Sequence, residues 1–151
     1  MKKIFFLTTI LLLTSLAINA KDTYTWKQYG LSFSVPEDFD VLKNNEESFE
    51  AENDEIYLSI EVLDYDGLTP EFFGELLGQM AISSEMEDAE VGELRLTTLE
   101  GAYIEGVVGA SNVIYVILLD TDSNIALIAS IVYEDGNERA ATNIVNSFAI
   151  K

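Results

Sequence analysis

Cysteine and histidine are both absent from this chain of 151 residues, and proline occurs only twice. Their absence excludes thiol nucleophiles, thiolate zinc sites, imidazole metal ligands and a Ser-His-Asp catalytic arrangement. Because no disulfide can form, the fold must be stabilised by a buried apolar core, which a domain of this size can build unaided. We therefore predict a protein that is not an enzyme and carries no cofactor.

Basic residues are also scarce, since eight lysines and arginines face 27 aspartates and glutamates, for a net charge of −19. A surface this acidic repels phosphate groups and anionic lipids, so we expect no nucleic-acid partner. Only Arg95 and Arg139 offer a bidentate clamp for phosphate, and no glycine-rich phosphate loop precedes a helix. The acidity has two explanations: solubility alone, or an acidic patch that binds a cation or a partner with a basic surface.

The first twenty residues have the pattern of a secretory signal peptide. Lys2 and Lys3 form a positive start, an apolar run broken only by two threonines follows at 4–13, and Ala20 suits the position before a cleavage site. The alternative is a membrane anchor. However, the apolar run is short for a span of about 20 residues, and polar residues follow it at once.

Cleavage after Ala20 leaves residues 21–151, which we predict to be a single domain. The removed segment 1–20 contains two lysines and no acid, so 6 basic residues remain against 27 acidic ones, a net charge of −21. No later segment is apolar over the length that a bilayer requires. We predict an exported protein, periplasmic or extracellular, that is not embedded in the membrane after processing.

Alternating apolar and polar residues, which are typical of half-buried strands, recur along the domain. Leu31, Phe33 and Val35 alternate with serines, and Pro36 ends this segment. Further strands are predicted at 23–29, 46–51, 56–62, 91–98 and 103–108. Turns are predicted at 53–54, 64–67 and 100–101, and the acidic segment 85–90 is predicted to be a loop.

Two segments have helical periodicity instead. Apolar residues recur at spacings of three and four through 70–84, with Thr69 as N-cap and Pro70 at the first helical position. A second helix is predicted to begin at Asp135, which with Glu138 makes an N-terminal capping pair.

The segments 113–119 and 125–133 are almost continuously apolar, so neither face of these strands can be left to water. The short polar loop 120–124 between them forces an antiparallel hairpin. Something must cover both faces of this hairpin, and the two predicted helices are available for it. The sequence therefore predicts an α+β domain in which helices cover both faces of a single central antiparallel sheet.

Two stretches resemble the PsbP/DcrB-like family. The segment YGLSFSVPEDF at 29–39 resembles the opening of these domains, and AATNIVNSFAIK at 140–151 resembles their last helix and short terminal strand. The family includes the extrinsic photosystem II protein, bacterial periplasmic relatives and a nuclear-import factor that binds Ran. The resemblance implies an α/β/α sandwich that acts as a binding or accessory domain. It supplies no shared catalytic motif.

Carboxylates are the one plentiful functional group, and two of them would suffice for a glycosidase-type hydrolase. With 27 acidic residues some such pair is inevitable, so the hydrolase is only a second alternative. Ser111 lacks the second glycine of a nucleophile elbow and is better explained as part of a hairpin turn.

Calcium is the cation that the acidic turns suit best. Asp120, Asp122 and Asn124 have the spacing of the first ligands of an EF-hand loop, but Ile125 and Ile131 stand where glycine and a bidentate glutamate are required. These failures exclude an EF-hand and leave a simpler turn-bound calcium ion. Asp64 and Asp66 fit the same description. Turns also require such residues for purely structural reasons.

Three aromatic residues alternate with polar ones near the start of the domain: Tyr24, Trp26 and Tyr29. They either line a ligand groove or anchor an edge strand, and we favour the anchor. The leading hypothesis is an exported binding or accessory domain whose partner is another protein. The alternative is a carrier of a small molecule or calcium, for which we would expect a pocket lined by Phe72, Phe73 and Tyr103.

Overall fold

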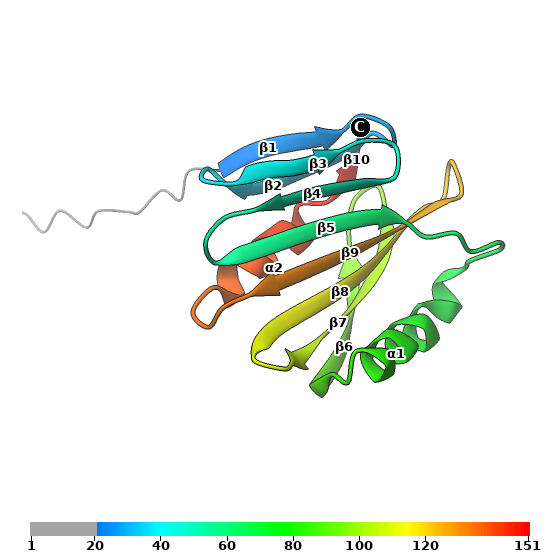
Figure 1. The fold of residues 1–151 in the computed structure, drawn as a ribbon. Coiled ribbons are helices and arrows are strands. Elements are labelled where there is room, and N and C mark those ends of the chain that lie inside the picture. The colour runs from blue at the N-terminus through cyan, green and yellow to red at the C-terminus, as the bar shows by residue number, and fades with distance from the viewer. Residues whose placement is uncertain (1–20) are drawn as a thin grey trace, which may run out of the picture.

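The computed structural model describes residues 21–151, so the predicted signal peptide lies outside the described residues. These residues form ten strands, one short 3-10 helix and two α-helices (Figure 1). In chain order they are β1 (Lys21–Trp26), β2 (Leu31–Pro36), β3 (Asp40–Asn44), β4 (Ser48–Glu52), β5 (Ile56–Val62), η1 (Pro70–Phe72), α1 (Phe73–Ser83), β6 (Glu87–Arg95), β7 (Glu100–Val108), β8 (Ser111–Asp120), β9 (Ile125–Tyr133), α2 (Glu138–Asn146) and β10 (Ala149–Ile150).

Seven strands form a large antiparallel sheet in the order β3-β4-β5-β9-β8-β7-β6. The predicted apolar hairpin is confirmed as β8–β9, with Asp120 opposite Ile125 at its turn. It lies in the interior of the sheet, because β9 also pairs with β5 along seven residues. Both hairpin strands therefore have partner strands on each side, and neither keeps a polar face because their side chains enter core clusters on both faces of the sheet.

A second sheet of three strands has the order β1-β2-β10. Its centre is β2, which pairs with β1 from Leu31 to Pro36 and with the short β10 through Leu31 and Ser32. Phe33 of β2 contacts Phe49 of the large sheet, with ring centroids 5.0 Å apart. The small sheet thus packs against the β3–β4–β5 part of the large one, as Figure 1 shows.

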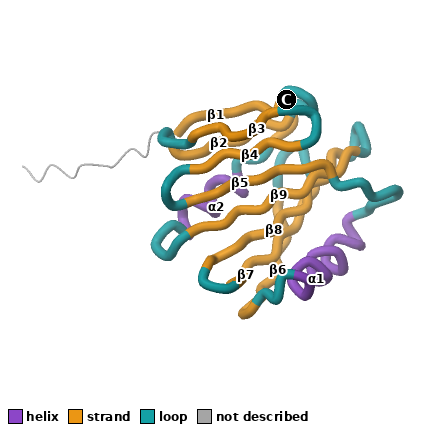
Figure 2. Tube along the Cα trace, viewed as in Figure 1, coloured by secondary structure: helices purple, strands orange, loops and turns teal. Residues whose placement is uncertain are grey.

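The predicted fold class is wrong in its architecture. The described residues form two sheets with two short α-helices, and they do not form a single sheet with helices on both faces, the α/β/α sandwich. One face of the large sheet carries α1, but the other is covered by the small sheet and α2 together (Figure 2). The burial argument required an apolar layer on that face, and strands satisfy it as well as a helix.

The hydrophobic core has two parts, one on each face of the large sheet. The larger part joins the small sheet, α2 and residues such as Leu58, Val116 and Ile131. The smaller part lies under α1, where Phe73 and Leu77 pack on Ile117. Alternate residues of β8 thus enter opposite halves of the core, as the pleat of a strand requires.

Several predicted boundaries are also wrong. The acidic segment 85–90 is not a loop throughout, because β6 already begins at Glu87. The turn predicted at 100–101 lies inside β7, and β3 was not predicted at all. The last helix begins at Glu138, and Asp135 does not cap it but accepts a hydrogen bond from Asn112. Among the described residues, no helix has the length and apolarity needed to cross a membrane.

Candidate functional site

One end of the large sheet carries a concentration of negative charge that we call the acidic edge. Within residues 85–105 the chain has a single base, Arg95, and seven acids: Glu85, Glu87, Asp88, Glu90, Glu93, Glu100 and Glu105. They lie on or beside β6, the last strand of the sheet, which among residues 21–151 pairs only with β7. Because one long side of β6 has no partner strand, its backbone groups there are available to another molecule.

The local geometry pushes the start of β6 outward. Its register with β7 is irregular between Glu87 and Glu90, and Asp88 has a left-handed backbone with φ of 53°. Opposite this irregularity stands Gly106, where a Cβ atom would lie 2.6 Å from the carbonyl oxygen of Glu87. The five residues 87–91 are exposed as a result, including the apolar Val91 at 59%. The edge therefore presents carboxylates around an exposed apolar residue.

Like charges are held together at this edge rather than neutralised. Glu90 of β6 stands directly opposite Glu105 of β7, a cross-strand pair that is unfavourable in isolation. Among residues 21–151, only Lys43 and Glu47 form an ion pair, with 3.9 Å between Nζ and Oε2. The carboxylates of the acidic edge thus form no ion pair inside the described domain, although Arg95 of β6 stands opposite Glu100 of β7.

A second candidate site is a groove of about 670 Å³ between the small sheet and the last helix, which we call the β2–α2 groove. Its apolar surface comes from Val35 and Pro36 on one side and from Ala140 and Ile144 on the other. Polar side chains surround this surface: Lys21, Ser34, Glu37, Asp38, Asn137, Arg139 and Asn143. The volume is within the range of small-molecule sites.

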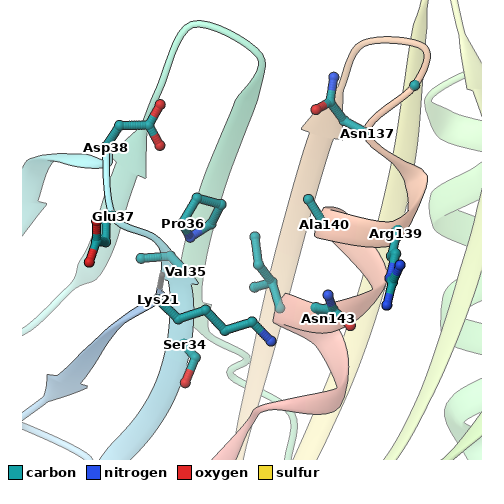
Figure 3. A pocket seen from close by; sticks show the side chains of 12 residues that line it. Lys21, Ser34, Val35, Pro36, Glu37, Asp38, Asn137, Arg139, Ala140 and Asn143 are labelled. Atoms are coloured by element: carbon teal, nitrogen blue, oxygen red, sulfur yellow. The ribbon is translucent and has the colours of Figure 1, made fainter. Parts of the chain in front are cut away.

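Figure 3 shows how the charged groups of the groove are directed. The side chain of Lys21 extends from the start of β1 toward α2. The carboxylate of Glu37 points away from the helix, and that of Asp38 accepts a hydrogen bond of 3.2 Å from Asn53 in the turn after β4. The Lys21 ammonium group thus faces the groove and the Glu37 carboxylate points away from it, while Asp38, which also lines the groove, is held by Asn53.

The calcium candidates lie in two exposed turns. Asp120 is already engaged as a turn residue, because its carboxylate accepts hydrogen bonds from the Asp122 backbone at 3.1 Å and from the Ser123 hydroxyl at 2.5 Å. Asn124 has a left-handed φ of 57°, as the turn requires. In the part of the chain that the structure describes, no three acidic side chains are arranged to hold a metal ion. Calcium binding at these residues, or at Asp64 and Asp66, stays a prediction.

The pocket considered for a small-molecule carrier does not form. Phe73 is buried between α1, to which it belongs, and one face of the sheet, whereas Tyr103 packs against the core on the opposite face. Phe72 is 41% exposed. These three aromatic residues therefore do not line one cavity.

Two tyrosines have perturbed acidity. Burial raises the pKa of Tyr133, and the negative charges of Glu105, Glu138 and Asp135 add to this effect. Burial also raises the pKa of Tyr57, together with its hydrogen bond of 3.1 Å to the Glu50 carboxylate. Both tyrosines are therefore neutral at physiological pH, and neither provides a nucleophile.

Sequence reasoning missed both candidate sites in their spatial form. The sequence shows the acids of 85–90 but predicts a loop for them. Their position at an unpaired sheet edge depends on the pairing of β6 with β7. The β2–α2 groove combines Lys21 with residues more than 110 positions later. The one sequence signal that relates these two distant segments is their resemblance to the same family.

Solved structures with a similar fold identify the fold type of this chain. Over 91% of its length the chain is similar to a cyanobacterial PsbP from Synechocystis, at a TM-score of 0.62 and 10% identity, covering 96% of that protein. It is also similar to the Ran-binding protein Mog1p of Saccharomyces cerevisiae, at a TM-score of 0.56 and 10% identity, covering 87% of this chain and 95% of that one. No family model and no curated protein matches the sequence. The chain therefore has a PsbP-like fold.

Proposed function

We propose that this protein is an exported, non-enzymatic accessory domain that binds a partner protein with a basic surface through its acidic edge. The observation that carries the proposal is the cluster of carboxylates around β6, which form no ion pair within the described domain. Such a cluster attracts a basic protein from a distance and selects against acidic ones. The exposed Val91 supplies apolar contact area at the centre of this charge.

The comparisons support a binding role in a coarser sense. One protein of this fold is named as Ran-binding, and the other is a PsbP protein. The absence of cysteine and histidine supports a role without catalysis. We expect the charges of the acidic edge to determine which partner this chain binds.

Neutralising the acidic edge tests the proposal. The variant Glu87→Gln, Asp88→Asn, Glu90→Gln, Glu93→Gln keeps the shapes of four side chains and removes their charges. We expect this variant to recover at least tenfold less cross-linked partner from the exported fraction than the unaltered protein does. Raised salt should reduce the recovery by the unaltered protein in the same way. The partner is identified by mass spectrometry and the loss is repeated with that partner in purified form.

A matched control changes the same number of charges elsewhere. Four exposed acids outside the acidic edge are neutralised together: Glu46, Glu55, Glu61 and Glu134. We expect this control to keep full partner recovery, because it alters the net charge equally without touching β6. Equal loss in both variants would show that only net charge matters, and equal recovery by both would reject the acidic edge as the binding surface.

The proposed export is tested by a separate measurement. If residues 1–20 are a signal peptide, the protein of the exported fraction begins at Lys21. Its intact mass then lacks the first twenty residues, and N-terminal sequencing returns Lys21. The full-length mass in a membrane fraction would instead support the membrane anchor.

A further inference from the structure

We propose that the β2–α2 groove is a second binding site, which takes an organic carboxylate with an apolar body. The inference goes beyond partner binding, because the groove lies between β2 and α2 whereas the acidic edge lies on β6. It also gives the export step a chemical role: cleavage after Ala20 creates a free amino group on a residue of the groove. That part of the inference rests on the proposed export.

The groove is richer in basic side chains than the molecule as a whole, because its two bases, Lys21 and Arg139, stand beside only two acids, Glu37 and Asp38. Residues 21–151 contain six basic side chains against 27 acidic ones, and two of the six, Lys21 and Arg139, line the groove. Neither forms an ion pair within the described residues. In a molecule with this excess of acid, two bases that stay without a carboxylate partner at one concave site provide a place for an external anion.

The polar groups of α2 fit the same ligand. Arg139 and Asn143 are four residues apart and therefore lie on one face of the helix, above and below each other. The groove also reaches Asn137 at the start of the helix, whose side-chain amide does not cap the helix but donates a hydrogen bond of 3.3 Å to the carbonyl oxygen of Glu134. The positive end of the helix dipole adds to the attraction for an anion there.

The apolar surface of the groove decides the rest of the ligand. Val35 and Ile144 are 1% exposed and belong to the core, so the apolar base of the groove that a ligand can reach comes from the half-buried Pro36 and Ala140. A small inorganic anion would leave this surface uncovered. A carboxylate with an attached alkyl chain places its charge near Lys21 and covers the apolar base.

Processing adds a second positive charge at the same position. Lys21 begins β1 and pairs with Pro36, which also lines the groove. Cleavage before Lys21 converts its backbone amide nitrogen into an α-amino group with an ordinary pKa of about 7.7–8.0, so most copies are protonated at neutral pH. The processed protein should therefore bind the carboxylate more tightly than a form in which this nitrogen is uncharged.

The test is calorimetric titration with decanoate, below its micelle concentration, of protein from the exported fraction whose intact mass confirms processing. We expect one site per protein, and at least tenfold weaker binding for the double variant Lys21→Met, Arg139→Gln. The control Lys27→Met removes an exposed base outside the groove and should bind as the unaltered protein does. Decanol and decylamine should bind at least tenfold more weakly than decanoate.

A final comparison separates processing from the groove itself. Acetylation near pH 6.5 modifies the α-amino group in preference to lysine side chains, because its pKa is lower. We expect acetylated protein to bind decanoate several-fold more weakly; unchanged binding would reject the role of processing while leaving the groove. If the intact mass shows no cleavage, the proposed export is wrong. The full chain is then titrated with decanoate, so that the groove is tested independently of export. Absent saturation, or equal affinity in the double variant and in Lys27→Met, would overturn the groove as a carboxylate site.

Discussion

Replacement of Ile117 by aspartate should destabilise the domain by several kcal/mol, enough to unfold a domain of ordinary stability. Ile117 is 0% exposed and lies on the central strand β8, between Ala102 of β7 and Ile128 of β9. It packs under α1 with Phe73 and Leu77. An aspartate there enters a cluster whose buried members are all apolar, so it must either be buried as a charge or force the strand and helix apart.

The effect is measured by urea unfolding followed by circular dichroism, with Ile82→Asp as a matched control. Ile82 is the same residue type but is 80% exposed on α1. The control should lose less than about 1 kcal/mol, chiefly because an acid near the C-terminal end of a helix opposes its dipole. If Ile117→Asp is soluble and unfolds at the same urea concentration as the unaltered protein, β8 is not the core strand described above.

The hairpin that contains Ile117 could be predicted from sequence because its evidence is local. Two almost continuously apolar runs joined by five polar residues allow few arrangements, and the β8–β9 hairpin is one of them. The strand at 56–62 was equally clear, since its alternating residues match the burial of β5. In these segments the periodicity of side chains and the tertiary burial agree.

The architecture could not be predicted because it depends on pairing between distant segments. Leu31 of β2 pairs with Ile150 of β10, near the opposite end of the chain, and this contact completes the small sheet. Hydrophobic patterning shows that a surface must be buried but does not show whether strands or helices cover it. The prediction assigned that cover to helices alone, which is where it failed.

The acidic edge illustrates the opposite difficulty. Glutamate and aspartate have low strand propensity, so the segment 85–90 was predicted to be a loop. Its pairing with β7 overrides that preference from Glu87 onward. The charge of the candidate site was visible in the sequence, but its position on an unpaired strand was not.

Replacement of Trp26 by alanine should cost about 3–5 kcal/mol, the range for loss of a large buried aromatic side chain. Trp26 is 0% exposed at the end of β1 and makes an edge-to-face contact with Tyr29, their ring centroids 4.6 Å apart. Its indole N–H donates a hydrogen bond of 2.6 Å to the carbonyl oxygen of Asn45, between β3 and β4. It therefore fastens the small sheet to the edge of the large one, as predicted for an anchor and not for a ligand groove.

Two further variants separate packing from hydrogen bonding. Trp26→Phe keeps an aromatic ring but leaves the Asn45 carbonyl without this donor, so we expect an intermediate loss of about 1–3 kcal/mol. Tyr65→Ala removes an aromatic side chain that is 41% exposed and should change stability by no more than about 0.5 kcal/mol. Because Trp26 is the sole tryptophan, unfolding is followed by circular dichroism in all variants. Equal stability of Trp26→Ala and Tyr65→Ala would mean that the two sheets are not joined through this residue.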